Sequence, residues 1–257
     1  PEPRMLSFQH PRALRALGRP LACYTRTIHA SSRACSQDPS SLVVHGVTYA
    51  TDDYTNIPSS IMSRVFPSPQ LPYREHHPLK ILREEIERVF GQKYSAIRAP
   101  SPVVTTKLNF DDLGFPANHP GRKPSDTYYV NRATCLRTHT SAHEVSTFRH
   151  GYKRWLLTAD VFRRDEIDSS HYPVFHQMEG ASVWGLDEFG SNGIVERECA
   201  AMEEKLRASG MEIHDGVNIA EADGWQDVHL RKHPEAANLA LRHLKASLNT
   251  LVLDLFK

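Results

Sequence analysis

The sequence has few cysteines, no long apolar run and almost no net charge. Its four cysteines stand apart among 257 residues and form no C-x-x-C pair, which argues against a disulfide framework and a zinc ribbon. No stretch reaches the roughly 20 apolar residues that a bilayer-spanning helix requires. The formal net charge is +1, so a surface that binds nucleic acid would have to be local.

The first 37 residues lack lysine and contain a single acidic residue, Glu2. They carry six arginines, and Leu14, Ala16 and Leu17 lie among three of these, which predicts a weakly amphipathic basic helix. A basic, serine-containing and acid-poor N-terminus is typical of a mitochondrial transit peptide. We therefore expect residues 1–37 to be a mitochondrial transit peptide outside the folded domain. The alternative is a disordered basic arm that binds nucleic acid.

Residues 77–90 predict an amphipathic core helix, because Pro78 suits its first turn and Gly91 suits its end. Apolar residues at helical spacing would line one buried face of it: Leu79, Leu82, Ile86, Val89 and Phe90. The following residues, 94–106, are strand-like, and two prolines among them mark a sheet edge or a bend.

The C-terminal part of the sequence has less pattern. Residues 181–234 predict a variable surface insertion with one short amphipathic helix over 198–209. A long helix is predicted from Pro234, because leucines recur there at steps of three and four residues. This helix reaches Lys257 without a capping glycine, and we expect from this that the chain is truncated.

The middle of the chain predicts a β-hairpin. Residues 156–163 are mostly apolar, the next residues alternate in charge and contain turn formers, and residues 173–179 alternate with a period of two. On the return strand Phe175, Gln177 and Glu179 share one face. If that face is buried, its polar side chains need partners, and a ligand with an ammonium group would supply them.

This hairpin resembles motif 2 of the class II aminoacyl-tRNA synthetases, in the form found in the phenylalanyl branch. There the first strand ends in F-R-x-[DE], the loop contains D-x-[ST]-H, and the return strand reads F-H-Q-x-E-G. The corresponding residues here are Phe162-Arg163-Arg164-Asp165, Asp168-Ser169-Ser170-His171 and Phe175-His176-Gln177-Met178-Glu179-Gly180. The alternative is an exposed hairpin whose charged side chains pair only with each other.

Three further segments carry the same resemblance. The predicted helix and proline-bearing strand resemble motif 1, the dimer-interface element of the class. The next segment resembles N-F-D-x-L…H-P-x-R…D-[TN]-[FY]-Y, which is specific to the phenylalanyl branch and is closer to its single-chain mitochondrial form than to the bacterial α-subunit. A third resembles L-R-x-H-T-S. In this sequence these residues are Asn109–Leu113, His119–Arg122, Asp126–Tyr129 and Leu136–His143.

The resemblance implies that phenylalanine is activated with ATP to the adenylate and is then transferred to the 3′ end of mitochondrial tRNA(Phe). Arg163 would be the catalytic residue, because a guanidinium can bind phosphate oxygens in pairs and stabilise charge on the α-phosphate. Phenylalanine would be bound by His139, Ser141, Ala142, His143, Glu144, Gln177, Met178 and Glu179. ATP would be bound by Arg163, Ser170, His171, Tyr172 and Phe175.

Two points about this site stay open in the sequence. Relatives generally have Gln where this chain has Glu144, which would change the charge near the substrate. The competing interpretation of His139, His143 and His150 is a zinc site, although no H-E-x-x-H is present.

Mg²⁺ should accompany ATP, but the sequence has no evident complete set of metal ligands.

The fold implied by the resemblance is α+β, with a class II antiparallel sheet flanked by helices. Residues 38–257 would be a partial catalytic domain that contains motifs 1 and 2, whereas the glycine-rich motif 3 and the anticodon-binding domain are absent, leaving the sheet incomplete. We expect a monomer in the mitochondrial matrix, with no membrane partner. The alternative function is a non-catalytic, synthetase-like binding protein or an inactive truncated isoform.

Overall fold

The computed structural model describes residues 40–65, 70–164, 167–190, 193–214 and 232–256. All of them belong to one compact unit, residues 37–257. The predicted transit peptide lies outside the described residues. None of the described helices combines the length and the apolar character needed to span a bilayer.

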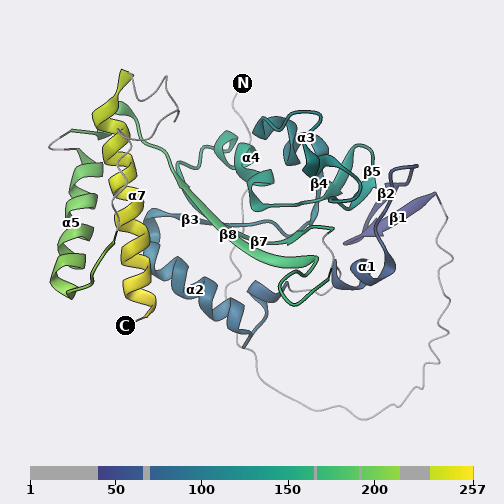
Figure 1. Ribbon diagram of the computed structural model, residues 1–257, viewed down its shortest axis with the longest axis horizontal. Coiled ribbons are helices and arrows are strands. Elements are labelled where there is room, and N and C mark those ends of the chain that lie inside the picture. Colours follow the sequence, from purple (N-terminus) through teal and green to yellow (C-terminus); the bar gives the residue numbers. More distant parts are fainter. Residues whose placement is uncertain (1–39, 66–69, 165–166, 191–192, 215–231, 257) are drawn as a thin grey trace, which may run out of the picture. The chain divides into compact units, whose positions relative to one another are not determined.

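The central sheet has three strands in the order β3-β7-β8 (Figure 1). The long strands β7 (Arg154–Phe162) and β8 (Val174–Ser182) pair antiparallel over nine residues each, which confirms the predicted hairpin. At its open end β7 starts two residues earlier and β8 ends three residues later than predicted. Strand β3 (Ser95–Arg98) lies parallel to β7. Every residue of β7 after Arg154 is buried, as its apolar composition predicts for a strand covered on both faces.

A second sheet packs its own small core beside this hairpin. Its order is β4 (Val103–Thr105), β6 (Thr134–Leu136) and β5 (Tyr129–Asn131), with antiparallel pairing throughout. The predicted strand over 94–106 is therefore two strands, β3 and β4, that are separated by Pro100 and Pro102. Proline lacks the N–H that would continue a ladder, so the chain leaves one sheet there and joins another. A two-stranded antiparallel ribbon, β1 (Ser41–Val44) and β2 (Val47–Ala50), precedes both sheets.

The predicted helix over 77–90 is α2 (Pro78–Phe90). The His77 side chain accepts a hydrogen bond from the Leu79 N–H at the start of the helix, and Gly91 ends it with a positive φ of 64°. The predicted buried face is wrong in one position, because Leu82 is 47% exposed whereas Arg83 is 5% exposed. Arg83 is buried because its guanidinium bonds the Pro72 carbonyl and the Glu87 carboxylate.

Short helices connect the strands. The α-helical ones are α1 (Ser59–Val65), α3 (Thr106–Asn109) and α4 (Glu144–Arg149). The 3₁₀ turns are Leu71–Tyr73, Gly91–Lys93, Asp111–Leu113, Pro120–Arg122, Thr140–His143 and Leu186–Glu188.

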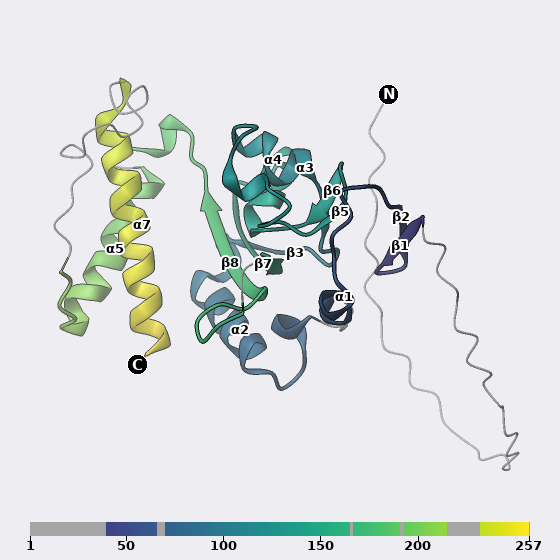
Figure 2. The ribbon, with the colours of Figure 1, turned by 45° about the vertical axis from the view of Figure 1, so that its right-hand side comes forward.

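The two long C-terminal helices, α5 (Ile194–Ser209) and α7 (Pro234–Leu255), lie side by side in both views (Figures 1 and 2). The predicted start at Pro234 is confirmed, whereas α5 begins four residues before its predicted start at 198. Their contact surface is a separate hydrophobic cluster that includes Val195, Cys199 and Leu206 of α5 and Leu239, Ala246 and Leu253 of α7. Helix α5, the described helix of the predicted surface insertion, is therefore packed against α7. The fold is α+β as expected, with one parallel strand pair in an otherwise antiparallel sheet.

Candidate active site

Strand β8 faces the 3₁₀ turn at Thr140–His143, and polar groups join the two elements. The Ser141 hydroxyl donates a hydrogen bond of 2.8 Å to Oε2 of Glu179. The Thr140 backbone N–H donates one of 3.3 Å to Oε1 of Gln177. The period of two along β8 puts Gln177 and Glu179 on this face. The structure thus brings together two segments that are far apart in the sequence and that the family resemblance assigns to phenylalanine.

Three polar atoms in this region are buried and make no hydrogen bond of normal geometry within the described residues. They are Oε1 of Glu179 and both ring nitrogens of His139. Buried polar atoms of proteins nearly always have partners, so a cluster of open ones indicates a place for a polar ligand. A carboxylate oxygen suits an ammonium group, and an imidazole N–H suits a carboxylate or a phosphate.

Burial controls the charge of these groups. It raises the pKa of the Glu179 carboxyl, with a smaller contribution in the same direction from the charge of Glu144, while hydrogen bonds from Ser141 and Thr140 oppose the shift. Burial lowers the pKa of His139, and the Arg163 charge lowers it further, although the Asn109 backbone opposes this. His139 is therefore neutral at neutral pH, which leaves one ring nitrogen as a donor and the other as an acceptor.

Arg163 and Phe175 lie together at the other end of the hairpin. The Arg163 guanidinium carbon is 5.1 Å from the centre of the Phe175 ring, a cation–π contact. Its Nε donates a hydrogen bond of 3.1 Å to the backbone carbonyl of Thr138. Because Nε carries this contact, the outer nitrogens Nη1 and Nη2 can serve a phosphate group.

The hairpin loop is held by its own acid. Asp168 accepts hydrogen bonds from the backbone N–H groups of Ser170 and His171, each 2.7 Å, and lies 2.8 Å from Nδ1 of His171. These contacts, the Ser170 N–H first, lower the pKa of the Asp168 carboxyl well below its usual range. Ser170, His171 and Tyr172 are exposed, and their role toward ATP stays a prediction.

Four other predicted residues lie at the edge of the site or away from it. Met178 points to the opposite face of β8, as strand alternation requires. Ala142 is packed in the hydrophobic cluster of the second sheet. Nε2 of His143 lies 3.0 Å from Nη1 of the buried Arg137, and burial with that charge lowers the pKa of His143 to about 4. Glu144 begins α4 and is close enough to Glu179 to affect its pKa.

Phe115, which the sequence did not single out, forms the wall behind His139. The Phe115 ring stacks on the His139 ring with an interplanar angle of 7° and a centroid distance of 5.8 Å. Arg122 fixes this wall, because its Nη2 donates to Oδ1 of Asp111 and to the Phe115 carbonyl, both at 2.6 Å. This gives the N-F-D…H-P-x-R string a physical reason that was not visible in the sequence. The N-F-D…H-P-x-R string was the sequence signal that could have pointed to this part of the site.

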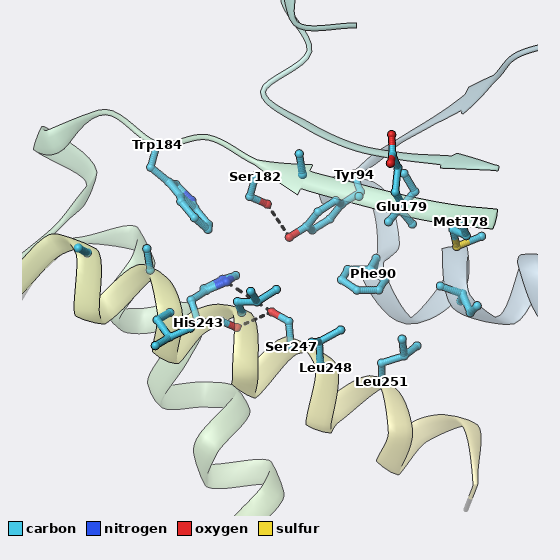
Figure 3. Close-up of a pocket in the computed structure, with 18 residues that line it drawn as sticks. Phe90, Tyr94, Met178, Glu179, Ser182, Trp184, His243, Ser247, Leu248 and Leu251 are labelled. Carbon is cyan, nitrogen blue, oxygen red and sulfur yellow. Dashed lines mark hydrogen bonds between the residues drawn. The ribbon is translucent and has the colours of Figure 1, made fainter. Parts of the chain in front are cut away.

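A cavity of about 610 Å³ forms a groove between α2, the edge of β8 and α7 (Figure 3). Its lining is mostly apolar and includes Phe90, Met178, Leu248 and Leu251. Glu179 also borders it, but Figure 3 shows the Glu179 carboxylate on the side of β8 away from α7. We therefore locate the candidate active site on the polar face of β8, where the convergent hydrogen-bonding groups are, and not in this groove.

The described residues contain no group of three or more His, Cys, Asp or Glu side chains arranged to hold a metal ion. The zinc alternative is not supported, because the rings of His143 and His150 contact Arg137 and the Ser146 carbonyl and do not converge with His139.

The sequence model of the class II core domain of tRNA synthetases, type F, matches residues 64–192, which is half of the chain and includes α2, the turn at Thr140–His143 and the whole hairpin. This chain belongs to the class II tRNA synthetase core family. The resemblance stated from motif 2 is thereby confirmed.

Curated relatives of this class II chain are phenylalanine–tRNA ligases. The mitochondrial enzyme of Saccharomyces cerevisiae is 37% identical over 83% of this chain and 49% of its own length. The mitochondrial enzyme of Mus musculus is 35% identical over 84% of this chain and 52% of its own length. The chloroplastic/mitochondrial enzyme of Arabidopsis thaliana is 44% identical over 63% of this chain and 38% of its own length. The chain thus spans about half, or less, of the length of these relatives.

Proposed function

We propose that this chain is the part of a mitochondrial phenylalanine–tRNA ligase that binds phenylalanine and ATP. The observation that carries the proposal is the single polar surface formed by Ser141, Gln177 and Glu179, with Arg163 and Phe175 at the end of the same hairpin. An amino-acid-binding face and a phosphate-binding arginine must be adjacent if a carboxylate is to reach the α-phosphate of ATP. The names of the relatives support the same substrates.

Glu179 would bind the ammonium group of phenylalanine. Ser141 bonds Oε2 of Glu179, which orients the carboxylate with its buried Oε1 open for the ligand. A half-buried carboxylate next to an ammonium group gains more than an exposed one, because less water screens the pair. Gln177 would add a second polar contact, and neutral His139 would donate to a carboxylate or phosphate oxygen.

Arg163 would stabilise the charge that develops on the α-phosphate. In the first step an oxygen of the phenylalanine carboxylate forms a bond to the α-phosphorus, and the bond between the α-phosphorus and the bridging oxygen breaks, releasing pyrophosphate. The nucleophile is already ionised, so no general base is needed, and positioning with charge stabilisation is the contribution of the protein. Phe175 would stack on adenine, with Ser170, His171 and Tyr172 nearer the other phosphates.

In the second step the adenylate would acylate the 3′ end of tRNA(Phe), and AMP would leave. Mg²⁺ would accompany ATP, whose phosphates usually supply part of its ligands. None of the roles assigned to the side chains above depends on that ion.

The test is calorimetric titration of this chain with a non-hydrolysable phenylalanyl-adenylate analogue. We expect micromolar or tighter binding, and Arg163→Ala should weaken it by about 3–4 kcal/mol, a few hundredfold or more. Arg164→Ala is the matched control, because Arg164 is the adjacent exposed arginine and its Nη1 bonds the Pro124 carbonyl. The leucyl analogue should bind more weakly than the phenylalanyl one.

Absence of binding, or equal losses in Arg163→Ala and Arg164→Ala, would overturn the ligase assignment. If the chain then still bound tRNA, the non-catalytic binding protein would be the better assignment.

The proposed compartment is the mitochondrial matrix, with the protein acting as a monomer. The yeast and mouse relatives are mitochondrial, and the acid-poor, arginine-rich first 37 residues support import. Mass spectrometry of the protein isolated from its own cells should find a mature N-terminus between about Arg26 and Leu42. An intact N-terminal segment on a cytosolic protein would contradict the matrix assignment. Light scattering of the purified protein tests the monomer.

A further inference from the structure

Asn109 is a fully buried polar residue that the proposed chemistry does not use. It ends the short helix α3 and is 0% exposed. Its Oδ1 accepts a hydrogen bond of 3.1 Å from the Thr138 backbone N–H, and its Nδ2 donates one of 2.9 Å to Oγ1 of Thr138. Because the backbone N–H can only donate, the oxygen of the Asn109 amide must face it, so the orientation of the amide is determined by its partners.

The peptide unit between Arg137 and Thr138 is held at both ends. Its N–H bonds Asn109, and its carbonyl oxygen accepts a hydrogen bond of 2.9 Å from the backbone N–H of Phe162. Phe162 is the last residue of β7 and directly precedes Arg163. With this peptide unit held at both ends and the Thr138 hydroxyl bonded to Asn109 as well, Thr138 has less freedom to turn, which restricts the direction of its own carbonyl relative to the end of β7.

The Thr138 carbonyl in turn accepts the 3.1 Å hydrogen bond from Nε of Arg163. Arg163 is exposed, and an exposed arginine has several rotatable bonds whose ordering on ligand binding costs conformational entropy. An anchor at Nε removes part of that cost before the ligand arrives, and it leaves Nη1 and Nη2 directed outward.

We propose that Asn109 is a positioning residue for Arg163 and acts through the backbone of Thr138. The inference rests on the proposed role of Arg163 in ATP binding. It assigns a purpose to the side chain of the first residue of the N-F-D string, whose printed hydrogen bonds in the described structure both go to Thr138. In this arrangement Asn109 sets the orientation of the guanidinium and makes no contact with ATP or phenylalanine.

A purely structural role of Asn109 predicts something different. Any buried hydrogen-bonded amide contributes to stability, and its loss would lower the free energy of unfolding without a particular effect on Arg163. The two roles are separated by measuring whether the effect of Asn109 on ligand binding depends on Arg163 being present.

The first arm is a double-mutant cycle on the phenylalanyl-adenylate analogue. We expect Asn109→Ala to weaken binding about tenfold, and Asn109→Ala with Arg163→Ala to bind no more weakly than Arg163→Ala alone. Thr127→Val is the matched control, because Thr127 is also 0% exposed and its Oγ1 donates a 2.6 Å hydrogen bond to the Gly121 carbonyl, with no link to Arg163. It should lose stability but not affinity. Multiplicative losses in the double variant would overturn the proposal.

The second arm does not depend on ligand binding. The side-chain Nε–H signal of Arg163 in a nitrogen–proton correlation spectrum, assigned by its disappearance in Arg163→Ala, should be protected from solvent exchange in the parent chain. Asn109→Ala should shift this signal and speed its exchange, whereas Thr127→Val should leave it unchanged. An unchanged signal in Asn109→Ala would overturn the inference even if the chain binds the analogue well.

Failure of the parent chain to bind the analogue, with the signal behaving as expected, would instead count against the proposed function.

A milder variant covers the possibility that Asn109→Ala does not fold. Thr138→Val keeps the backbone and the size of the side chain and removes only the bond from Nδ2 of Asn109. We expect a smaller change of the Arg163 Nε–H signal and a weakening of binding of about twofold to threefold, again absent when Arg163 is already alanine. No change in either measurement would count against the proposal.

Discussion

The Ser141 hydroxyl bonds one oxygen of the Glu179 carboxylate, and the other oxygen is buried without a hydrogen-bond partner in the described structure. This relationship fixes the direction of the carboxylate. It also makes Glu179 costly to keep ionised, because burial raises its pKa and one oxygen has lost water without gaining a donor. A ligand that brings an ammonium group would remove this cost.

Glu179→Gln should weaken the binding of phenylalanine about tenfold to a hundredfold, since a hydrogen bond to a charged group is worth about 1.5–3 kcal/mol. Glutamine keeps the size of the side chain and an oxygen that can accept from Ser141. The measurement is calorimetric titration with phenylalanine and with 3-phenylpropionate, which lacks the ammonium group. Equal losses for both ligands would contradict the ammonium role. Glu75→Gln is the control, because the Glu75 side chain is 75% exposed.

The same substitution should stabilise the protein without ligand at neutral pH. The pKa of Glu179 is raised above its ordinary value of 4.5, so the folded state binds the proton more tightly than the unfolded chain. Below that ordinary value the carboxyl is protonated in both states, and the tighter proton binding of the folded state contributes fully to stability. This contribution is lost as the pH rises through the folded pKa. The stability advantage of Glu179→Gln should therefore grow from acidic to neutral pH in urea unfolding experiments. An advantage that shrinks as the pH rises would show that the sign is wrong.

Arg137→Ala should lower the free energy of unfolding by about 2–5 kcal/mol, because it removes the donor to one buried and one partly buried carbonyl, each worth about 1–3 kcal/mol. Nε of Arg137 donates to the Asp160 carbonyl at 2.6 Å, and Nη1 donates to the Ser101 carbonyl at 2.8 Å. Burial lowers the pKa of Arg137 to about 10, but the side chain stays charged at neutral pH. The control is Arg98→Ala, since Arg98 is exposed and stacks on Tyr73. Comparable losses in urea unfolding would contradict this account.

Leu253→Ala and Leu248→Ala should differ although both residues lie on α7. Leu253 is 9% exposed and belongs to the cluster with α5, so its truncation should cost about 2–5 kcal/mol. Leu248 is 50% exposed and borders the groove beside β8, so its truncation should cost less than about 1 kcal/mol. Urea unfolding of both variants measures this. If Leu248→Ala were as costly, the groove would be covered in solution, and light scattering would show whether a second copy covers it.

Local pattern was sufficient for the elements that carry the family motif. The hairpin was predictable because its turn formers and its alternation lie within a few residues of each other, and α2 was predictable from Pro78 and Gly91. The assignment of Gln177 and Glu179 to one face required only the period of two.

Long-range packing decided what local pattern could not. Arg83 is buried and Leu82 is exposed because a carbonyl at Pro72 and the Glu87 carboxylate lie where they satisfy a guanidinium. The parallel pairing of β3 with β7 depends on a contact between segments that are more than fifty residues apart.

The sequence by itself determined the class II family, the hairpin and the chemistry of its polar face, because strand alternation and turn formation depend only on neighbouring residues. Only the tertiary structure decided that Ser141 meets Glu179, that Phe115 backs His139, and that Asn109 reaches Arg163 through Thr138. Each of these contacts joins residues from separate elements. A hydrogen bond between such residues exists only after the elements have packed and excluded the water that would otherwise compete for it.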